Sequence, residues 1–91
     1  MKFFVYVLQS RIKKYIYVGL TNSLTRRVGQ HQDGKGRTTA AYRPFDLIHV
    51  EEFEERSQAR KRERYLKSGV GKEWIKTHGS VSARLPAGRQ V

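Results

Sequence analysis

The chain has 91 residues, which suits one small domain near the lower limit for a stable core. It has no cysteine, which excludes disulfides and thiolate zinc sites and suits a reducing cytoplasm. No apolar run approaches the roughly 20 residues of a membrane span, so we expect a soluble, cytoplasmic protein, with a monomer favoured. Nineteen Lys and Arg against eight Asp and Glu give a net charge of +11. Since the basic residues fall on several separate elements, this excess of positive charge predicts nucleic acid as the partner. The alternative is a basic protein made soluble by its charge.

Two apolar runs near the N-terminus predict a β-hairpin. The runs are Phe3–Leu8 and Tyr15–Leu20, separated by the polar stretch Gln9–Lys14. A turn centred on Arg11–Ile12 would connect them.

Each strand of this hairpin carries a tyrosine. With that turn, Tyr6 lies directly opposite Tyr17, so both phenols project from one face of the sheet. A buried phenol needs a hydrogen-bond partner or a task, because an unpaired hydroxyl costs roughly 1–3 kcal/mol. Gly19 follows at the strand end, where it would let a ligand or another backbone come close. The pair therefore points to catalysis.

A first helix is predicted from about Ser23 to Gln32. Thr21–Ser23 supplies N-cap candidates, Leu24 and Val28 begin an apolar stripe, and Gly34 ends the helix.

Arg27 and His31 are neighbours on this helix, at the rim of its buried face. A guanidinium can grip two phosphate oxygens, and an imidazole exchanges protons near neutral pH. Considered alone, Arg27 would be an ordinary solvated charge, and His31 would be a surface residue or a core residue with satisfied hydrogen bonds. Together they suit a phosphate.

A basic, mobile loop is predicted over Gly34–Arg43, and Pro44 closes it. The stretch Phe45–Phe53 then predicts a third strand whose acidic end is polar and solvated.

The second helix is predicted over Arg56–Lys67, with Ser57 as its cap. Glu63 lies on the same stripe as the apolar Ala59 and Leu66, so this carboxylate points inward. Such a carboxylate is rarely tolerated unless it is paired or binds a metal. One alternative is a metal site, and the other is an internal ion pair with a base on either helix.

Val70, Trp74 and Ile75 predict a short third helix set off by glycines. Residues 79–91 lack a helical or strand period and predict a disordered tail, so we expect one domain over residues 1–78. The order strand, strand, helix, strand, helix, helix predicts an α+β fold with a three-stranded sheet packed against helices.

The order and spacing of these residues resemble the GIY-YIG nuclease superfamily, and most of all its small standalone bacterial members. Phe4-Val5-Tyr6 stands at the first signature tripeptide and Tyr17-Val18-Gly19 at the second. The family arginine falls on Arg27, His31 follows it on the same helix, and the family's metal-binding glutamate falls on Glu63.

The resemblance covers residues 2–77 and implies an antiparallel sheet, hydrolysis of a DNA phosphodiester, and one divalent cation, Mg²⁺ or Mn²⁺, on the glutamate. Either Tyr6 or Tyr17 could activate water. The chain departs from the family twice: the first tripeptide retains only its tyrosine, and the asparagine that many relatives carry after the glutamate is absent, since the sole asparagine is Asn22.

The leading hypothesis is a metal-dependent DNA endonuclease of weak or structural specificity, as used in DNA repair. Its catalytic residues are Tyr6 and Tyr17 around the water, Arg27 on the phosphate, His31 assisting proton transfer and Glu63 on the metal. The alternatives are a non-catalytic module that binds DNA or RNA and an accessory protein on RNA. The predicted nucleic-acid contacts are the bases Lys35, Arg37, Arg43, Arg60, Arg64 and Lys67.

Overall fold

The computed structural model describes residues 1–84 of the chain. The predicted α+β class, with its three-stranded antiparallel sheet, is confirmed. In chain order the elements are β1 (Phe3–Ser10), β2 (Ile16–Thr21), α1 (Leu24–Gln32), the 3₁₀ turn η1 (Ala40–Tyr42), β3 (Phe45–Phe53), α2 (Arg56–Lys67) and α3 (Gly69–Arg84).

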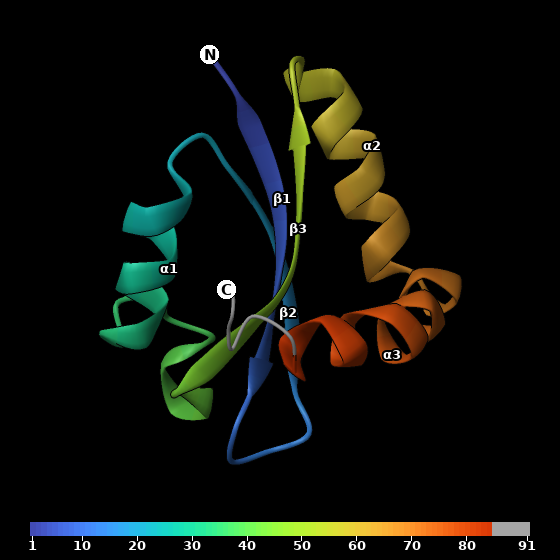
Figure 1. Ribbon diagram of the computed structural model, residues 1–91. Helices are drawn as coiled ribbons and strands as arrows, with labels where there is room; N and C mark the ends of the chain where they lie inside the picture. Colours follow the sequence, from blue (N-terminus) through green and yellow to red (C-terminus); the bar gives the residue numbers. More distant parts are fainter. Residues whose placement is uncertain (85–91) are drawn as a thin grey trace.

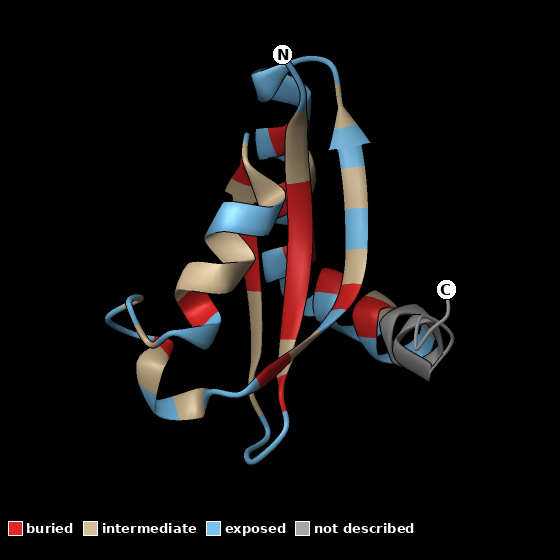
Figure 2. Ribbon diagram, turned by 60° about the vertical axis from the view of Figure 1, so that its left-hand side comes forward, coloured by how far each residue is buried: buried red, intermediate tan, exposed pale blue. Residues whose placement is uncertain are grey.

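The sheet has the order β2-β1-β3, so β1 is the central strand and pairs antiparallel with both neighbours. Figure 1 shows α1 on one face of the sheet and α2 with α3 on the other. The middle of β1 is buried because helices cover it on both sides, and Figure 2 shows this strand as the most continuously buried one. β2 and β3 are the two edges.

The two faces of β1 contribute side chains to two separate cores, because successive side chains of a strand point to opposite faces. Val5 and Val7 pack with Ala59, Leu66 and Ile75 on the side of α2 and α3. Tyr6 and Leu8 face α1 and pack with Phe45. A side chain that faces α1 therefore comes from the even positions of β1.

The predicted register of the hairpin is wrong by two residues. Tyr6 lies opposite Gly19, and Tyr17 lies opposite Leu8. The turn is longer than expected because the Ser10 hydroxyl accepts hydrogen bonds from the backbone N–H groups of Ile12 and Lys13, both at 3.2 Å. Since side chains alternate with period two, a shift of two residues leaves both phenols on the predicted face.

The third helix is longer than the short one predicted, and its start differs in detail. Gly71 lies inside it, where a Cβ atom would come within 1.9 Å of the Tyr65 carbonyl oxygen, so this glycine marks a close helix contact instead of a boundary. α3 ends at Arg84, inside the segment 79–91 predicted as a disordered tail, and residues 85–91 lie outside the described part. The N-cap of α2 is Glu55, without a side-chain cap hydrogen bond, and not Ser57.

A half-buried ionic group ties β3 to the helices behind it. Arg62 Nε donates to both carboxylate oxygens of Glu51, at 2.9 and 3.0 Å, and His49 Nε2 lies 2.7 Å from the same carboxylate. The Arg62 guanidinium lies 4.9 Å from the centre of the Trp74 ring. Burial alone would raise the pKa of Glu51, but the hydrogen bonds from Arg62 and His49 outweigh it and hold the pKa below its usual value.

Replacement of Glu51 by Gln removes this charged acceptor, and we expect a loss of about 1–2 kcal/mol in the free energy of unfolding at pH 7. A lowered folded-state pKa stabilises the fold above the unfolded value of about 4.3, and this contribution is lost as the pH falls through the folded value. Urea unfolding should therefore give a difference between wild type and E51Q that shrinks at acidic pH. An equal difference at pH 7 and pH 3 would contradict the assignment.

The exposed Glu54 supplies the control. It pairs with Lys2 at the surface, at 2.7 Å, and E54Q should leave the free energy of unfolding nearly unchanged at either pH.

Candidate active site

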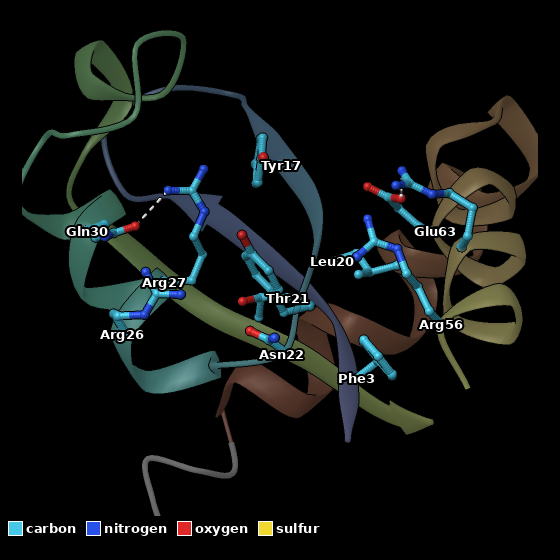
Figure 3. Close-up of a pocket in the computed structure, with 12 residues that line it drawn as sticks. Phe3, Tyr17, Leu20, Thr21, Asn22, Arg26, Arg27, Gln30, Arg56 and Glu63 are labelled. Carbon is cyan, nitrogen blue, oxygen red and sulfur yellow. Dashed lines mark hydrogen bonds and ion pairs between the residues drawn. The ribbon is translucent and has the colours of Figure 1, made fainter. Parts of the chain in front are cut away.

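An open cleft of about 430 Å³ lies along the edge strand β2, between α1 and α2. Figure 3 shows Arg26 and Arg27 coming from α1 on one side and Arg56 and Glu63 from α2 on the other, with Tyr17 and Leu20 on the strand between them. Because Tyr17 and Leu20 project from opposite faces of β2, the cleft crosses the sheet edge. Side chains from both faces therefore meet in one site.

The structure brings four of the five predicted catalytic residues together in this cleft. Tyr6 comes from β1, Tyr17 from β2, Arg27 from α1 and Glu63 from α2. They belong to four different elements, and the convergence that the hypothesis requires is present.

Gly19 makes room for a side chain, and not for a ligand or a backbone as expected. A Cβ atom at Gly19 would lie 2.5 Å from both Cζ and Oη of Tyr6 and 2.8 Å from the Tyr17 ring. The Tyr6 ring therefore crosses directly over Gly19. The Tyr6 side chain thereby extends from the central strand, and its hydroxyl lies toward the cleft.

We expect Gly19→Ala to displace the Tyr6 ring and to lower the free energy of unfolding by about 1–3 kcal/mol, as overpacking of a filled core does. Urea denaturation measures this change. Gly29 in α1 is the matched control, because a Cβ atom there meets nothing within 4 Å. G29A should leave stability unchanged or raise it by up to about 1 kcal/mol. Equal stability of G19A and wild type would show that the ring does not need this space.

His31 is buried, whereas the sequence placed it at the rim. It is only 1% exposed, it does not line the cleft, and its Nε2 atom lies 3.0 Å from the Tyr6 hydroxyl. Its Nδ1 atom lies 2.9 Å from Thr39 Oγ1. Burial, aided by the charge of Arg27, lowers the pKa of His31. The imidazole is therefore neutral at pH 7, and it is linked to the cleft by its hydrogen bond with Tyr6 and by ring packing against Tyr17, at 4.8 Å between ring centres.

The two signature tyrosines differ in access. Tyr6 has no exposed surface, whereas Tyr17 is partly exposed. Burial and the neighbouring Tyr17 raise the pKa of Tyr6 above its ordinary value, against an opposing effect of Arg27. Tyr6 is therefore protonated at pH 7, and Tyr17 is the phenol that a bound molecule can touch.

Arg27 is held in place by its own helix. Its Nη1 atom donates to Gln30 Oε1 at 2.8 Å, and both side chains line the cleft (Figure 3). One hydrogen bond thus fixes the guanidinium and leaves other N–H groups for a phosphate.

Glu63 has features of both predicted roles, the internal ion pair and the metal site. It is 6% exposed and lines the cleft, and its two oxygens also pair with Arg60 at 2.9 Å and Lys67 at 3.1 Å on its own helix. Within residues 1–84 no three His, Cys, Asp or Glu side chains form a cluster. A single carboxylate still suits Mg²⁺, which keeps several waters and needs few protein ligands.

Arg26 and Arg56 also line the cleft, although neither was predicted as a site residue. Helical periodicity could have found Arg56, because it lies on one stripe of α2 with Arg60 and Glu63. Arg26 carries no such signal, since the sequence shows only that it is the residue beside Arg27. Asn22 lines the cleft too, although it lies far from Glu63 in the sequence.

Of the six predicted nucleic-acid contacts, Arg60 alone lines the cleft as described. Lys35, Arg37 and Arg43 are exposed on the loop after α1, and Arg64 and Lys67 are exposed on α2. That loop is partly ordered, because it contains η1 and the buried Thr39.

The profile of the GIY-YIG catalytic domain matches residues 2–80. The chain belongs to the GIY-YIG family. It is similar to small UPF0213 proteins of bacteria and archaea. One from Natronomonas pharaonis is 39% identical over 66 residues, which cover 71% of this chain and 76% of that protein. One from Listeria welshimeri is 42% identical over 65 residues, which cover 70% and 71%.

The fold has a GIY-YIG counterpart among solved structures. The solution NMR structure of the UPF0213 protein BH0048 from Bacillus halodurans has a TM-score of 0.59 and 26% identity, and the match covers 99% of this chain and 100% of that one. The predicted family is thus confirmed. The similar proteins come from archaea as well as from bacteria. A GIY-YIG domain is of nuclease type, which implies a nucleic-acid substrate and, typically, a divalent metal. No helix in the described residues is long and apolar enough to cross a membrane.

Proposed function

We propose that this protein is a metal-dependent endonuclease that hydrolyses DNA phosphodiester bonds. The observation that carries the proposal is the meeting of Tyr17, Arg27 and Glu63, from three elements, in one open cleft. Hydrolysis of a phosphodiester needs an oriented water, positive charge on the phosphate and stabilisation of the leaving oxygen. Each of these side chains suits one of the three tasks.

Arg27 is the proposed phosphate ligand. Its hydrogen bond to Gln30 preorganises the guanidinium, so little reorganisation is needed when negative charge develops on the phosphate. Arg60 lies on the opposite wall and is held by Glu63. A strand in the cleft would then have a fixed cation on each side.

Tyr17 is the proposed contact to the attacking water, because it is the partly exposed phenol of the pair. Tyr6 and His31 are buried behind Tyr17 and do not contact the attacking water directly. The role of His31 in proton transfer thus becomes indirect, since the imidazole contacts Tyr6 and not the cleft.

Glu63 is the proposed ligand of a divalent cation, Mg²⁺ or Mn²⁺. Such an ion would lower the pKa of a bound water and neutralise charge on the phosphate oxygens. Arg60 and Lys67 hold the same carboxylate now, so they would have to share or release its oxygens. Their guanidinium and ammonium groups would then be free to contact the strand.

The distribution of charge supports an approach from the side of β2. Four acids lie along β3 and its end, namely Asp46, Glu51, Glu52 and Glu54. β3 is the opposite edge of the sheet, so these carboxylates, each of them paired with a base, are turned away from a strand bound in the cleft. Arginines that contact phosphates do not read bases, and we propose weak sequence specificity or selection of DNA structure, as suits DNA repair by a cytoplasmic monomer.

Glu63→Gln tests the catalytic carboxylate, since the amide keeps the shape and removes the charge. We expect nicking of supercoiled DNA in Mg²⁺ to fall by at least about 100-fold, with DNA affinity nearly unchanged. E73Q, which changes an exposed acid on α3, is the control and should nick like the wild type. Equal nicking by wild type and E63Q would exclude this role.

Arg26 and Arg56 test the cleft as the DNA interface. Within the described chain neither makes a side-chain hydrogen bond or an ion pair, and both line the cleft. Fluorescence anisotropy against salt concentration should show the slope of log Kd falling by about 1 in each alanine variant. K76A on α3, which lies outside the cleft, should keep the wild-type slope. Unchanged slopes in R26A and R56A would place the DNA elsewhere.

The second candidate is a nucleic-acid-binding module without catalysis. The ion pairs that occupy both oxygens of Glu63 favour it, because they explain a buried carboxylate without a metal. This candidate predicts no cleavage of branched, nicked, single-stranded or duplex DNA in Mg²⁺ or Mn²⁺. Competition between DNA and RNA at fixed salt would then separate a DNA-binding module from an RNA-binding one.

A further inference from the structure

A second cavity, of about 570 Å³, lies between the turn end of the hairpin and α3. Figure 1 shows α3 beside this end of the sheet, whereas the loop from β2 to α1, next to the cleft, lies at the other end. The cavity shares no described lining residue with the cleft, so it is a separate site. Its described lining residues are Gln9, Lys14, Tyr15, Ile16, Lys72 and Lys76.

Two of these lysines carry unpaired positive charge. The Lys14 and Lys72 side chains are exposed, and they form no hydrogen bond or ion pair with the side chains that the structure describes. Lys76 is paired instead, since its Nζ atom lies 3.5 Å from Glu73 Oε2, which agrees with the unchanged salt slope expected for K76A. No described Asp or Glu lines the cavity. An anion there would therefore meet two ammonium groups without competing acids.

The hairpin wall of the cavity is apolar, with one amide. Ile16 packs against the core beneath α2 and α3, and its partner across the hairpin is Gln9. The Gln9 amide has no hydrogen-bond partner within the described part of the chain. Lysine ammonium groups and glutamine amides are among the groups that contact the phosphates and sugars of DNA. The lining therefore suits a nucleic-acid backbone.

The cavity and the cleft lie along one side of the edge strand β2. Ile16 lines the cavity and Leu20 lines the cleft, and because they are four residues apart, their side chains project from the same face. At about 3.3 Å per residue they are about 13 Å apart, which matches about four nucleotides of a duplex strand at about 3.4 Å each. DNA bound in the cleft can therefore extend to the cavity.

Basic side chains also continue from one site to the other. Lys67 is on the same stripe of α2 as Glu63, four residues nearer to α3, and its side chain is 53% exposed. Arg60 lines the cleft before it, and Lys72 lines the cavity after it. A row of basic residues thus follows the side of α2 and α3 that faces β2, away from the acids of β3.

We propose that this cavity is a second DNA-contact site, in which Lys14 and Lys72 bind backbone phosphates of the same duplex that occupies the cleft. The identity of the ligand rests on the proposed nuclease function. Contacts to the backbone position a duplex on the protein without reading its bases. The bound duplex extends at least about four base pairs from the cleft on the side of the cavity.

The salt dependence of DNA binding tests the two lysines. Each phosphate contact contributes about 0.9 to the slope of log Kd against log salt concentration, so the double variant K14A/K72A should lower the slope by about 2 on a duplex of about 20 base pairs. Fluorescence anisotropy measures it. An unchanged slope in the double variant would overturn the proposal.

Two other exposed lysines are matched controls. Lys13 is the neighbour of Lys14, but its Nζ atom lies 5.3 Å from the centre of the Tyr42 ring and the residue does not line the cavity. Lys61 is on α2 and lines neither site. K13A and K61A should each keep the wild-type slope. An equal fall of about 1 in each control would show that any lysine has this effect and would refute the cavity as a specific contact.

NMR titration shows whether one duplex covers both sites. In ¹⁵N-labelled wild type without Mg²⁺, the backbone amide signals of Ile16 and Leu20 should shift together on addition of a duplex of about 12 base pairs, roughly 40 Å long. Both should saturate at one equivalent. A shift at Leu20 alone, or saturation of the Ile16 signal only by a second equivalent, would contradict the proposal.

Neither measurement needs cleavage, so failure of this inference is distinguishable from failure of the proposed function. Shifts at both residues in a protein that nicks no DNA would support the second contact and contradict the nuclease function. A shift at Leu20 alone in a protein that nicks DNA would support the nuclease function and refute the second contact.

Discussion

The site depends on one steric constraint, the passage of the Tyr6 ring over Gly19. β1 is the central strand, and a side chain on it reaches the sheet edge only by crossing its neighbour β2. Gly19 is the residue directly opposite, and any side chain there would occupy the place of the phenol. The hydroxyl thereby meets His31 on one side and the cleft on the other. Packing thus explains why the second signature tripeptide ends in a glycine.

An edge strand lets helices from opposite faces of the sheet share one site. α1 covers one face and α2 the other, yet Arg27 and Glu63 line the same cleft because β2 is the last strand on that side (Figure 3). The ionic group of Glu51 and Arg62 fixes α2 against β3 on the far side. Four arginines, Arg26, Arg27, Arg56 and Arg60, thus line the cleft at the β2 edge, and the acids of β3 lie on the opposite edge strand.

Several side-chain positions followed from local patterns alone. The periodicity of α2 placed Glu63 inward, and the structure buries it with Ala59 and Leu66. Strand periodicity placed Tyr6 and Tyr17 on one face, although the assumed turn was too short. His31 could not be placed in this way, because its burial results from packing against Tyr6, Tyr17 and Phe45, which come from three strands.

By itself, the sequence determined the α+β class, the bounds of β3 and α2, the inward carboxylate and the resemblance to GIY-YIG nucleases, because each depends on local periodicity or on residue order. Tertiary structure decided the strand order, the cleft at β2, the ion pairs of Glu63 and the contact of Thr39 with His31. These depend on distances between residues far apart in the chain, and such distances are fixed only when both faces of β1 are packed.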